Sequence, residues 1–280
     1  MKFDAAIKNG CQELKKNNIR SALLDSEILL SKVIKKDRKF ILLNLDKELN
    51  QSDQNDFQDL IIKRSKGKPI AHLTGIKSFW KFDFKVNNKV LIPRPESEII
   101  IEQVLKIYKN KDNLNFLEVG VGSGCIALSI LKEKKFFLGT GIDLSKDCIK
   151  ICKDNAENLG VNSRLRLIKS DVDNLNFGKY DLIISNPPYI KKFDLKKLDK
   201  EVKNYEPRLA LDGGLEGISV IRKVIKKSSE LIKTHGKLIL EIGCDQTEQI
   251  KKMLDKKNFY INKIVKDLAK NDRCIICTKK

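Results

Sequence analysis

The sequence predicts an α/β protein whose main part is a mostly parallel, seven-stranded, doubly wound sheet. From residue 115 onward, apolar runs of strand length alternate with helical patterns, which is typical of parallel sheets covered by helices. Residues 1–70 show helical spacing alone, whereas 76–92 have the pattern of a β-hairpin. We therefore expect a helical domain over residues 1–75, a hairpin linker over 76–92, and an α/β domain over 93–280.

Four helices are expected in the first 70 residues, because apolar residues recur there at intervals of three and four. The first begins near Phe3, the second covers residues 21–34, and the third covers 37–44. Ser52 is a candidate N-cap of the fourth helix, which Gly67 would end. No catalytic constellation is visible here, so the module is a candidate for binding a substrate or for covering the hairpin.

The hairpin is predicted from aromatic and β-branched residues at 79–86, a turn at Asn87-Asn88, and a returning strand at 90–92. Residues 93–98 then lead into a helix over about 97–109. In the α/β part, the expected strands are 116–119, 138–142, 165–168, 180–185, 237–242, 259–265 and 273–278. The expected helices are 125–131, 145–159, 216–233 and one around residue 250. Sheets of this type bind ligands at the carboxyl ends of their strands.

The formal net charge of +19 favours an anionic partner such as nucleic acid, because 56 Lys and Arg face 37 Asp and Glu. Only nine of those 56 residues are arginine, the residue that base and bidentate phosphate contacts favour. The lysine excess looks like a compositional drift of the whole chain. The charge therefore supports a nucleic-acid contact only weakly.

Neither a membrane span nor a secretory signal is expected, because no stretch approaches roughly 18 apolar residues and no apolar run follows residues 1–4. The seven cysteines are expected as free thiols in a reducing cytoplasm. Cys274 and Cys277 lie on a predicted strand and point to opposite faces, so they cannot easily share a zinc ion. No metal site is predicted, and neither His72 nor His235 is given a catalytic role.

A glycine-rich loop follows the first strand of the predicted sheet, in the sequence Glu-Val-Gly-Val-Gly-Ser-Gly at residues 118–124. A dinucleotide site would require G-x-G-x-x-G, but Cys125 stands in the place of the last glycine. The G-x-G-x-G spacing instead fits an S-adenosylmethionine loop, whose bare backbone lets the ligand approach. The residues expected to hold the cofactor here are Gly120, Val121, Gly122, Ser123 and Gly124.

Acidic residues at the ends of the next two strands extend this predicted cofactor site. Asp143 could accept hydrogen bonds from both ribose hydroxyls, or it could act only as a carboxylate at a helix N-terminus before Ser145. Asp171 and Val172 follow the third strand, where the adenine would lie. A polar side chain would read its amino group and an apolar one would cover its face.

The motif that decides the chemistry is Ser-Asn-Pro-Pro-Tyr at residues 185–189, directly after the fourth strand. Pro187 and Pro188 fix the backbone and donate no N–H, so nearby carbonyl groups stay free. Asn186 adds a side-chain amide oxygen, and together these oxygens can accept both hydrogens of a planar NH₂ group. Tyr189 can pack its ring over that group. A mere turn is improbable after a glycine loop and an acidic residue in this order.

The order of glycine loop, Asp143 and Asn-Pro-Pro-Tyr resembles class I, Rossmann-like, S-adenosylmethionine-dependent methyltransferases that act on planar NH₂ nitrogens. These include DNA adenine-N6, ribosomal RNA guanine-N2 and protein glutamine-N5 enzymes. Residues 92–98, Ile-Pro-Arg-Pro-Glu-Ser-Glu, are similar to the Ile-Pro-Arg-Pro-Glu-Thr-Glu stretch of the PrmC/HemK family, the peptide chain release factor glutamine methyltransferases. Further similar segments are 205–211, 213–214, 241–243 with Gln246, and 267–268 with Arg273.

The resemblance implies methyl transfer from S-adenosyl-L-methionine, leaving S-adenosyl-L-homocysteine, to the glutamine of the Gly-Gly-Gln loop in class I release factors. Asn186, Pro187 and Tyr189 would be the catalytic residues, and Pro188 would help to bind the substrate. Asn186 would also contact the cofactor. The helical domain would bind the protein substrate. The family usually has Asp where this chain has Glu118, which keeps the acidic character with one extra methylene.

Two alternatives to this function stay open at the level of sequence. A nucleic-acid amino-methyltransferase would read an extruded base with the same Asn-Pro-Pro-Tyr motif. A non-catalytic module that only binds the cofactor is the other. Within the site, Arg94 and Glu96 fit either a loop that closes over the substrate or a rigid lead into the next helix. Glu206 and Arg208 are expected to pair at the rim.

Overall fold

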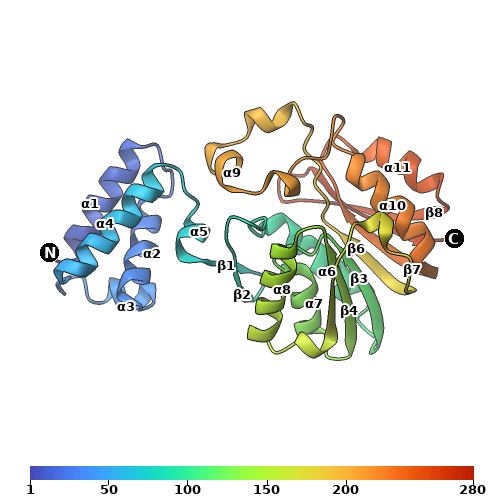
Figure 1. Ribbon diagram of the computed structural model, residues 1–280, viewed down its shortest axis with the longest axis horizontal. Coiled ribbons are helices and arrows are strands. Elements are labelled where there is room, and N and C mark those ends of the chain that lie inside the picture. The colour runs from blue at the N-terminus through green and yellow to red at the C-terminus, as the bar shows by residue number, and fades with distance from the viewer. The chain divides into compact units, whose positions relative to one another are not determined.

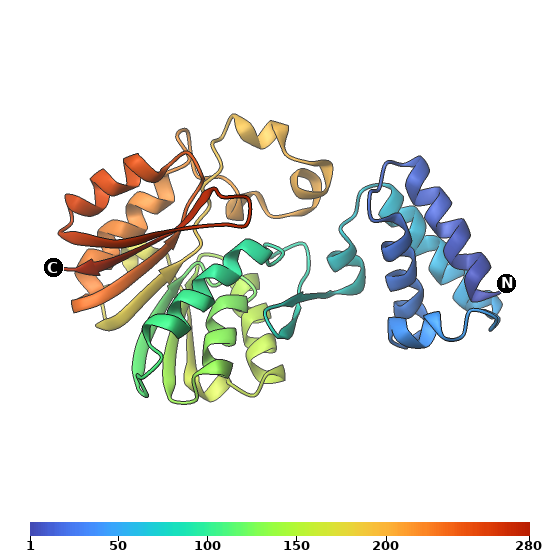
Figure 2. The same ribbon diagram turned by 180° about the vertical axis from the view of Figure 1, so that it is seen from behind.

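The computed structural model describes residues 1–280 and divides the chain into two compact units (Figures 1 and 2). The first unit comprises residues 1–76 and 199–205, and the second comprises 77–198 and 206–280. No helix in either unit combines the length and the apolar character that crossing a membrane requires. Each unit has its own hydrophobic core.

The first unit is helical, as the sequence predicts. Its helices are α1 (Phe3–Lys16), α2 (Ala22–Ile34), α3 (Arg38–Leu42), α4 (Gln51–Ser65), α5 (Ile70–Thr74) and α9 (Lys200–Tyr205). Leu14, Leu29 and Ile61 are fully buried where α1, α2 and α4 pack together. The short helices α5 and α9 were not expected, because five or six residues give too little periodicity to detect.

The cap of α4 differs from the sequence prediction. Asn50, not Ser52, is the N-cap, and its Oδ1 accepts a hydrogen bond from Asp53 N at 2.8 Å. Ser52 lies inside the first turn. The Asn50 side chain also donates to Asp53 Oδ2 at 2.8 Å, so the cap and the N3 residue hold each other.

A buried arginine fastens three helices of the first unit. Arg64 on α4 is only 4% exposed, and its guanidinium contacts Asp25 on α2 at 2.6 Å and Glu201 on α9 at 2.7 Å. It also donates to the Lys68 carbonyl at 3.1 Å. The two carboxylates compensate for the cost of burying the cation, and together they raise the pKa of Arg64 against the effect of burial. This cluster places residues 199–205 within the helical unit.

The hairpin forms, but its turn lies elsewhere than the sequence predicts. Strands β1 (Ile76–Phe79) and β2 (Phe82–Lys85) pair across a two-residue turn in which Trp80 has φ of 57°. A turn does occur at Asn87, whose Oδ1 accepts from Lys89 N at 2.8 Å, but residues 90–92 form no returning strand. The register follows burial, because the rings of Phe79 and Phe84 both enter the core with their centroids 6.1 Å apart.

The second unit contains the seven-stranded, mostly parallel sheet, which confirms the predicted fold class. Its strands are β3 (Leu114–Val119), β4 (Phe137–Asp143), β5 (Leu165–Lys169), β6 (Tyr180–Ser185), β7 (Ile232–Glu241), β8 (Phe259–Lys266) and β9 (Asp272–Lys279). Their spatial order is β5-β4-β3-β6-β7-β9-β8. The first five strands of this order are parallel, and β9 pairs antiparallel with both β7 and β8.

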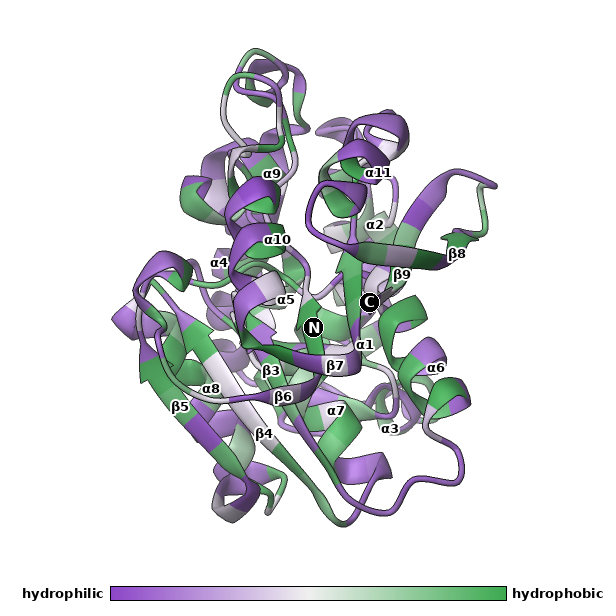
Figure 3. Ribbon diagram, turned by 90° about the vertical axis from the view of Figure 1, so that its right-hand side faces the viewer, coloured by the Kyte–Doolittle hydropathy of each residue, from purple (hydrophilic) through white to green (hydrophobic).

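Helices cover both faces of this sheet. One face is covered by α6 (Glu98–Ile107), α7 (Cys125–Glu133) and α8 (Lys146–Asn158), and the other by α10 (Ser219–Leu231) and α11 (Thr247–Asp255). Along β9, Cys274 belongs to the core under α6–α8 and Cys277 to the core under α10 and α11, as their spacing predicts. Both α10 and α11 alternate between hydrophobic and hydrophilic residues in Figure 3, as expected for helices with one buried face.

Asn155 on α8 joins the hairpin to the glycine loop. Its Oδ1 accepts from Lys85 N at 2.8 Å, and its Nδ2 donates to Lys85 O at 3.1 Å and to Ser123 O at 2.8 Å. The side chain is 1% exposed, so water cannot replace these bonds. One amide therefore satisfies backbone groups of two segments that flank the predicted site.

We expect Asn155→Ala to lower the free energy of unfolding by about 2–3 kcal/mol, because the buried carbonyl of Ser123 and the partly buried backbone groups of Lys85 lose their partner. Urea denaturation followed by circular dichroism measures this change. Asn158→Ala, at an exposed position on the same helix, is the matched control and should change the free energy by less than about 0.5 kcal/mol. Equal effects of the two substitutions would contradict the bridging role.

Candidate active site

The register of the sheet brings four strand ends to one edge. Val119 on β3 pairs with Ile142 on β4 and with Ser185 on β6, and Ser185 pairs in turn with Leu240 on β7. The residues that directly follow these four are Gly120, Asp143, Asn186 and Glu241. The chain leaves β3 toward β4 on one side and later returns to β6 on the other, so this edge is the topological switch point of the sheet.

The glycine loop turns tightly over the end of β4. The N–H groups of Gly120 and Val121 both donate to the Ile142 carbonyl, at 2.9 and 3.0 Å. Gly120 and Gly122 have φ of 78° and 54°, and a Cβ at either position would meet nothing within 4 Å. Gly124 differs, because its Cβ would lie 2.6 Å from Cys152 Sγ. The first two glycines therefore border open space, and the third allows α7 to pack.

Asp143 holds the glycine loop from the neighbouring strand. Its Oδ2 accepts from Gly122 N at 3.0 Å, and its Oδ1 accepts from Ser145 N at 2.9 Å. Burial raises the pKa of this carboxyl, while the two backbone donors act in the opposite direction. Ser123, between these glycines, has a buried side chain. The structure thus joins Asp143 and the loop, two elements that the sequence analysis assigned to one site.

Glu118 lies beneath this loop. It is 2% exposed, and its Oε2 accepts from Ala127 N in the first turn of α7 at 2.8 Å. Burial is the main reason that its pKa rises to about 8, and the charge of Asp143 adds to the shift. The carboxyl therefore carries a proton for much of the neutral pH range, unlike an ordinary surface glutamate.

The predicted adenine residues lie farther along the same edge. Asp143 pairs with Lys169, and Asp171 and Val172 follow that strand by two and three residues. Asp171 Oδ1 accepts from Asp173 N at 2.9 Å, so it caps the 3₁₀ helix Val172–Asn174. Val172 is 7% exposed and packs in the core under α10. Neither side chain makes a hydrogen bond to the glycine loop.

The Asn-Pro-Pro-Tyr segment lies beside the glycine loop, after β6. Asn186 Nδ2 donates to Ser97 Oγ at 2.9 Å, and Tyr189 OH lies 3.5 Å from Glu241 Oε1. Pro187 is buried and Pro188 is half-buried. The burial of Tyr189 is the main cause that raises its pKa to about 12, so its hydroxyl keeps its proton.

Two side chains without a predicted role support the Asn-Pro-Pro-Tyr segment. Gln246 donates to the Tyr189 carbonyl at 2.9 Å and to the Gly217 carbonyl at 3.1 Å. Arg273 donates to the Tyr189 hydroxyl at 3.4 Å. The signal that could have found these residues is that Glu241, Gln246 and Arg273 all belong to segments similar to one family.

The predicted pair of Glu206 and Arg208 does not form. Glu206 is 7% exposed and instead pairs with Arg94, while it also accepts from Ile92 N at 3.0 Å. Arg208 pairs with Asp212 at 3.2 Å. Pro95 begins the 3₁₀ helix Pro95–Ser97, so residues 94–97 lead directly into α6.

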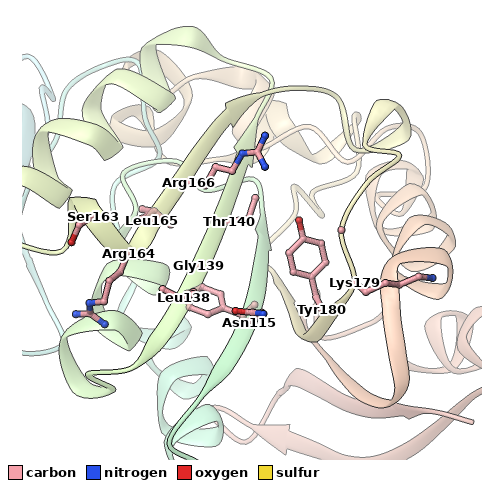
Figure 4. A pocket seen from close by; sticks show the side chains of 12 residues that line it. Asn115, Leu138, Gly139, Thr140, Ser163, Arg164, Leu165, Arg166, Lys179 and Tyr180 are labelled. Atoms are coloured by element: carbon pink, nitrogen blue, oxygen red, sulfur yellow. The ribbon is translucent and has the colours of Figure 1, made fainter.

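One cavity, of about 450 Å³, lies elsewhere in the second unit. Its lining includes Asn115 at the start of β3, Leu138 at the start of β4 and Tyr180 at the start of β6 (Figure 4). These are the amino ends of parallel strands, whereas ligands of such sheets bind at the carboxyl ends. The lining contains none of the residues predicted to bind a cofactor or substrate.

Comparison with known proteins tests these inferences. Residues 5–75 match the PrmC N-terminal domain, and residues 97–266 match the methyltransferase small domain. The release factor glutamine methyltransferase of Caulobacter vibrioides is 34% identical over 267 residues, which cover 95% of this chain and 92% of that protein. This chain belongs to the release factor glutamine methyltransferase family.

Other members of the release factor glutamine methyltransferase family show the same extent of similarity. The protein of Clostridium acetobutylicum is 34% identical over 282 residues, which cover 100% of this chain and 99% of the relative. The protein of Fusobacterium nucleatum is 36% identical over 279 residues, which cover 95% of this chain and 76% of the relative. The resemblance drawn from the motifs is thereby confirmed, and this chain is a methyltransferase.

Solved structures support the fold independently of these sequences. A methyltransferase from Pyrococcus furiosus superposes with a TM-score of 0.55 at 22% identity, covering 79% of this chain and 97% of that one. The ribosomal protein L11 methylase from Lactobacillus delbrueckii gives a TM-score of 0.52 at 16% identity, covering 69% and 82%. At these identities the likeness shows the fold alone.

We expect Asp143→Asn to weaken the binding of S-adenosylhomocysteine at least about tenfold, because a hydrogen bond to a charged group contributes about 1.5–3 kcal/mol. The new amide would also turn a donor toward the N–H of Gly122 or Ser145. Isothermal titration calorimetry gives the dissociation constant. Asp147→Asn, an exposed acid in the next helix, is the control, and a similar loss in both variants would contradict a specific role.

Proposed function

We propose that this enzyme transfers a methyl group from S-adenosylmethionine to the side-chain amide nitrogen of a glutamine in a class I release factor. By family resemblance that glutamine belongs to the Gly-Gly-Gln loop. The observation that carries the proposal is the direction of the Asn186 amide. Its Nδ2 is occupied by Ser97 Oγ at 2.9 Å, so its Oδ1 is left to accept from a substrate N–H.

The residues at the switch point fit S-adenosylmethionine. Gly120 and Gly122 border open space that a Cβ would enter, next to the carboxylate of Asp143. We propose that the loop residues Gly120 to Gly124 and Asp143 hold the methionine and ribose parts, that Asp171 and Val172 hold the adenine, and that Asn186 contacts the cofactor. When bound, S-adenosylmethionine would supply a methyl group activated by a sulfonium.

The chain's own contribution is to position the acceptor nitrogen. An amide nitrogen is a poor nucleophile, because its lone pair is delocalised into the carbonyl group. Asn186 Oδ1 and the Pro187 carbonyl would accept its two hydrogens and turn the lone pair toward the methyl group. These bonds strengthen as the nitrogen becomes cationic, and Tyr189 and Pro188 would form the wall of the pocket. The nitrogen then loses a proton easily, so no strong base is required.

We propose that the helical domain, residues 1–75, recognises the release factor, and that the hairpin at 76–92 links it to the methyltransferase domain at 93–280. The match of residues 5–75 to the PrmC N-terminal domain supports a role that is specific to this family. The net charge of +19 remains compatible with a nucleic-acid contact. The relatives from Caulobacter vibrioides and Clostridium acetobutylicum, which match 95% and 100% of this chain, are named release factor glutamine methyltransferases, and this disfavours nucleic acid as the acceptor.

We expect Asn186→Ala to lower methyl transfer at least about a hundredfold and to weaken binding of S-adenosylhomocysteine far less than that, because the acceptor that is lost strengthens in the transition state. Transfer is measured by peptide mass spectrometry of a purified release factor, with a gain of one methyl on the Gly-Gly-Gln glutamine. Circular dichroism confirms folding of the variant.

Asn115→Ala, at an exposed residue at the amino end of β3, is the matched control and should transfer at the normal rate. Unchanged turnover in Asn186→Ala would reject the mechanism. Methylation of RNA or DNA in parallel tubes, with none on the release factor, would reject the proposed substrate.

A further inference from the structure

A chain of hydrogen bonds runs from Asn186 to a buried carboxylate. Asn186 Nδ2 donates to Ser97 Oγ at 2.9 Å, and Ser97 Oγ donates to Glu241 Oε2 at 2.6 Å. Ser97 is 2% exposed and Glu241 is 1% exposed, so water cannot substitute for either partner. The three residues come from the end of β6, the lead into α6 and the end of β7.

The chemistry of the three groups fixes the direction of this chain. An ionised carboxylate only accepts hydrogen bonds, and a serine hydroxyl has a single proton to donate. Because that proton is committed to Glu241, Ser97 can only accept from its other neighbour. Asn186 must therefore present its NH₂ group to Ser97, which turns its Oδ1 away from Ser97.

The second oxygen of the same carboxylate faces the other end of the motif. Tyr189 OH lies 3.5 Å from Glu241 Oε1, and Arg273 donates to that hydroxyl at 3.4 Å. Arg273 is itself held by Asp267 at 3.0 Å, and its guanidinium lies 5.9 Å from the centroid of the Tyr189 ring. Glu241 thus contacts both ends of the Asn186–Tyr189 segment, one through Ser97 and the other directly.

We propose that Glu241 and Ser97 are positioning residues that hold the Asn186 amide with its oxygen toward the acceptor nitrogen and hold Tyr189 beside it. This inference rests on the proposed function and deepens it. Neither residue touches the reacting atoms. Their effect is to exclude the flipped amide, which would present two donors to an NH₂ group that also donates.

The ionisation state of Glu241 links this arrangement to pH. Burial is the main cause that raises its pKa to about 7, and Glu96 also raises it. The Ser97 hydroxyl, the Arg273 charge and the Tyr189 hydroxyl lower it. Burial raises the pKa values of the Cys125 and Cys274 thiols well above the ordinary range, and the charge of Glu241 adds to both shifts, so both thiols stay protonated.

The direction in which kcat changes with pH follows from the number of protons that Glu241 and Ser97 can donate. Below about pH 7 the carboxyl is protonated and can donate to Ser97 Oγ, which frees the serine proton to point at Asn186. The flipped amide then becomes possible. The turnover number should therefore rise with pH through about 7 as Glu241 ionises.

Four variants test the proposal in the full-length enzyme. Ser97→Ala removes the middle member of the hydrogen-bond chain from Asn186 to Glu241, and Ser97→Thr keeps the hydroxyl. Glu241→Gln keeps the shape but adds a donor that can face Ser97. Ser228→Ala removes a buried hydroxyl from α10 that has no hydrogen-bond partner, and is the matched control. Circular dichroism checks the fold of each.

We expect kcat to fall about 10-fold to 100-fold in Ser97→Ala and Glu241→Gln, because misplacement of a positioning group by about 1 Å has effects of this size. KM for the release factor and for S-adenosylmethionine should stay within about twofold, because ground-state binding is retained. Ser97→Thr should keep most of the activity, and Ser228→Ala all of it. The rise of kcat through about pH 7 should disappear in Glu241→Gln.

The side-chain amide resonances of Asn186, assigned by comparison with Asn186→Ala, give a readout that needs no substrate. In the wild type and Ser97→Thr they should shift with a midpoint near pH 7, and in Glu241→Gln they should not titrate. Absence of this titration in the wild type would overturn the proposal that Glu241 and Ser97 position the Asn186 amide. A wild-type kcat and pH profile in both Ser97→Ala and Glu241→Gln would overturn it as well. If the titration is observed but no release factor gains a methyl group, the proposed function is overturned, whereas the positioning of Asn186 by Ser97 and Glu241 is supported.

Discussion

The pairing of β3 with β6 is the constraint on which the site depends. These strands are separated in sequence by β4, β5 and α8, yet Val119 lies opposite Ser185 in the parallel ladder. That register puts the glycine loop and Asn186 at adjacent strand ends. A slip of β6 by one residue would turn Leu182 and Ile184 toward the opposite helical layer, so the hydrophobic core enforces the geometry of the site. Core packing fixes the strand register in this fold, and the register in turn fixes the geometry of the site.

The periodic parts of the structure could be predicted from sequence because their signals are local. Alternating strand and helix patterns predict the sheet, and the motifs after its strands predict which edge carries the site. Contacts between distant segments could not be predicted in the same way. Glu241 and Ser97 are 144 residues apart, and Glu206 finds Arg94 across 112 residues rather than its neighbour Arg208. The hairpin turn was misplaced because Asn87-Asn88 has stronger turn chemistry than Trp80, whereas burial of the flanking phenylalanines decided the register.

Two buried glutamates lie at the same edge of the sheet and illustrate how carboxyl groups behave there. Glu118 near the end of β3 and Glu241 at the end of β7 have pKa values raised to about 8 and about 7, each chiefly by burial. Each accepts a hydrogen bond from another element, from Ala127 N at 2.8 Å in one case and from the Ser97 hydroxyl at 2.6 Å in the other. Burial of a carboxyl is costly unless such donors compensate for it, and strongly shifted groups gather at functional sites.

The packing of the hairpin determines where the chain can be truncated without disrupting the core of the methyltransferase unit. Phe84 is fully buried in the core under α6–α8, and the backbone and indole N–H groups of Trp80 bond to Glu98 and Glu133 at 2.6 and 2.7 Å. A truncation that begins at residue 93 would open a hole in this core and remove the partner of Asn155. A cut close to residue 77 would leave it intact. Aromatic packing thus makes the hairpin part of the α/β core, which begins well before the first strand of the large sheet.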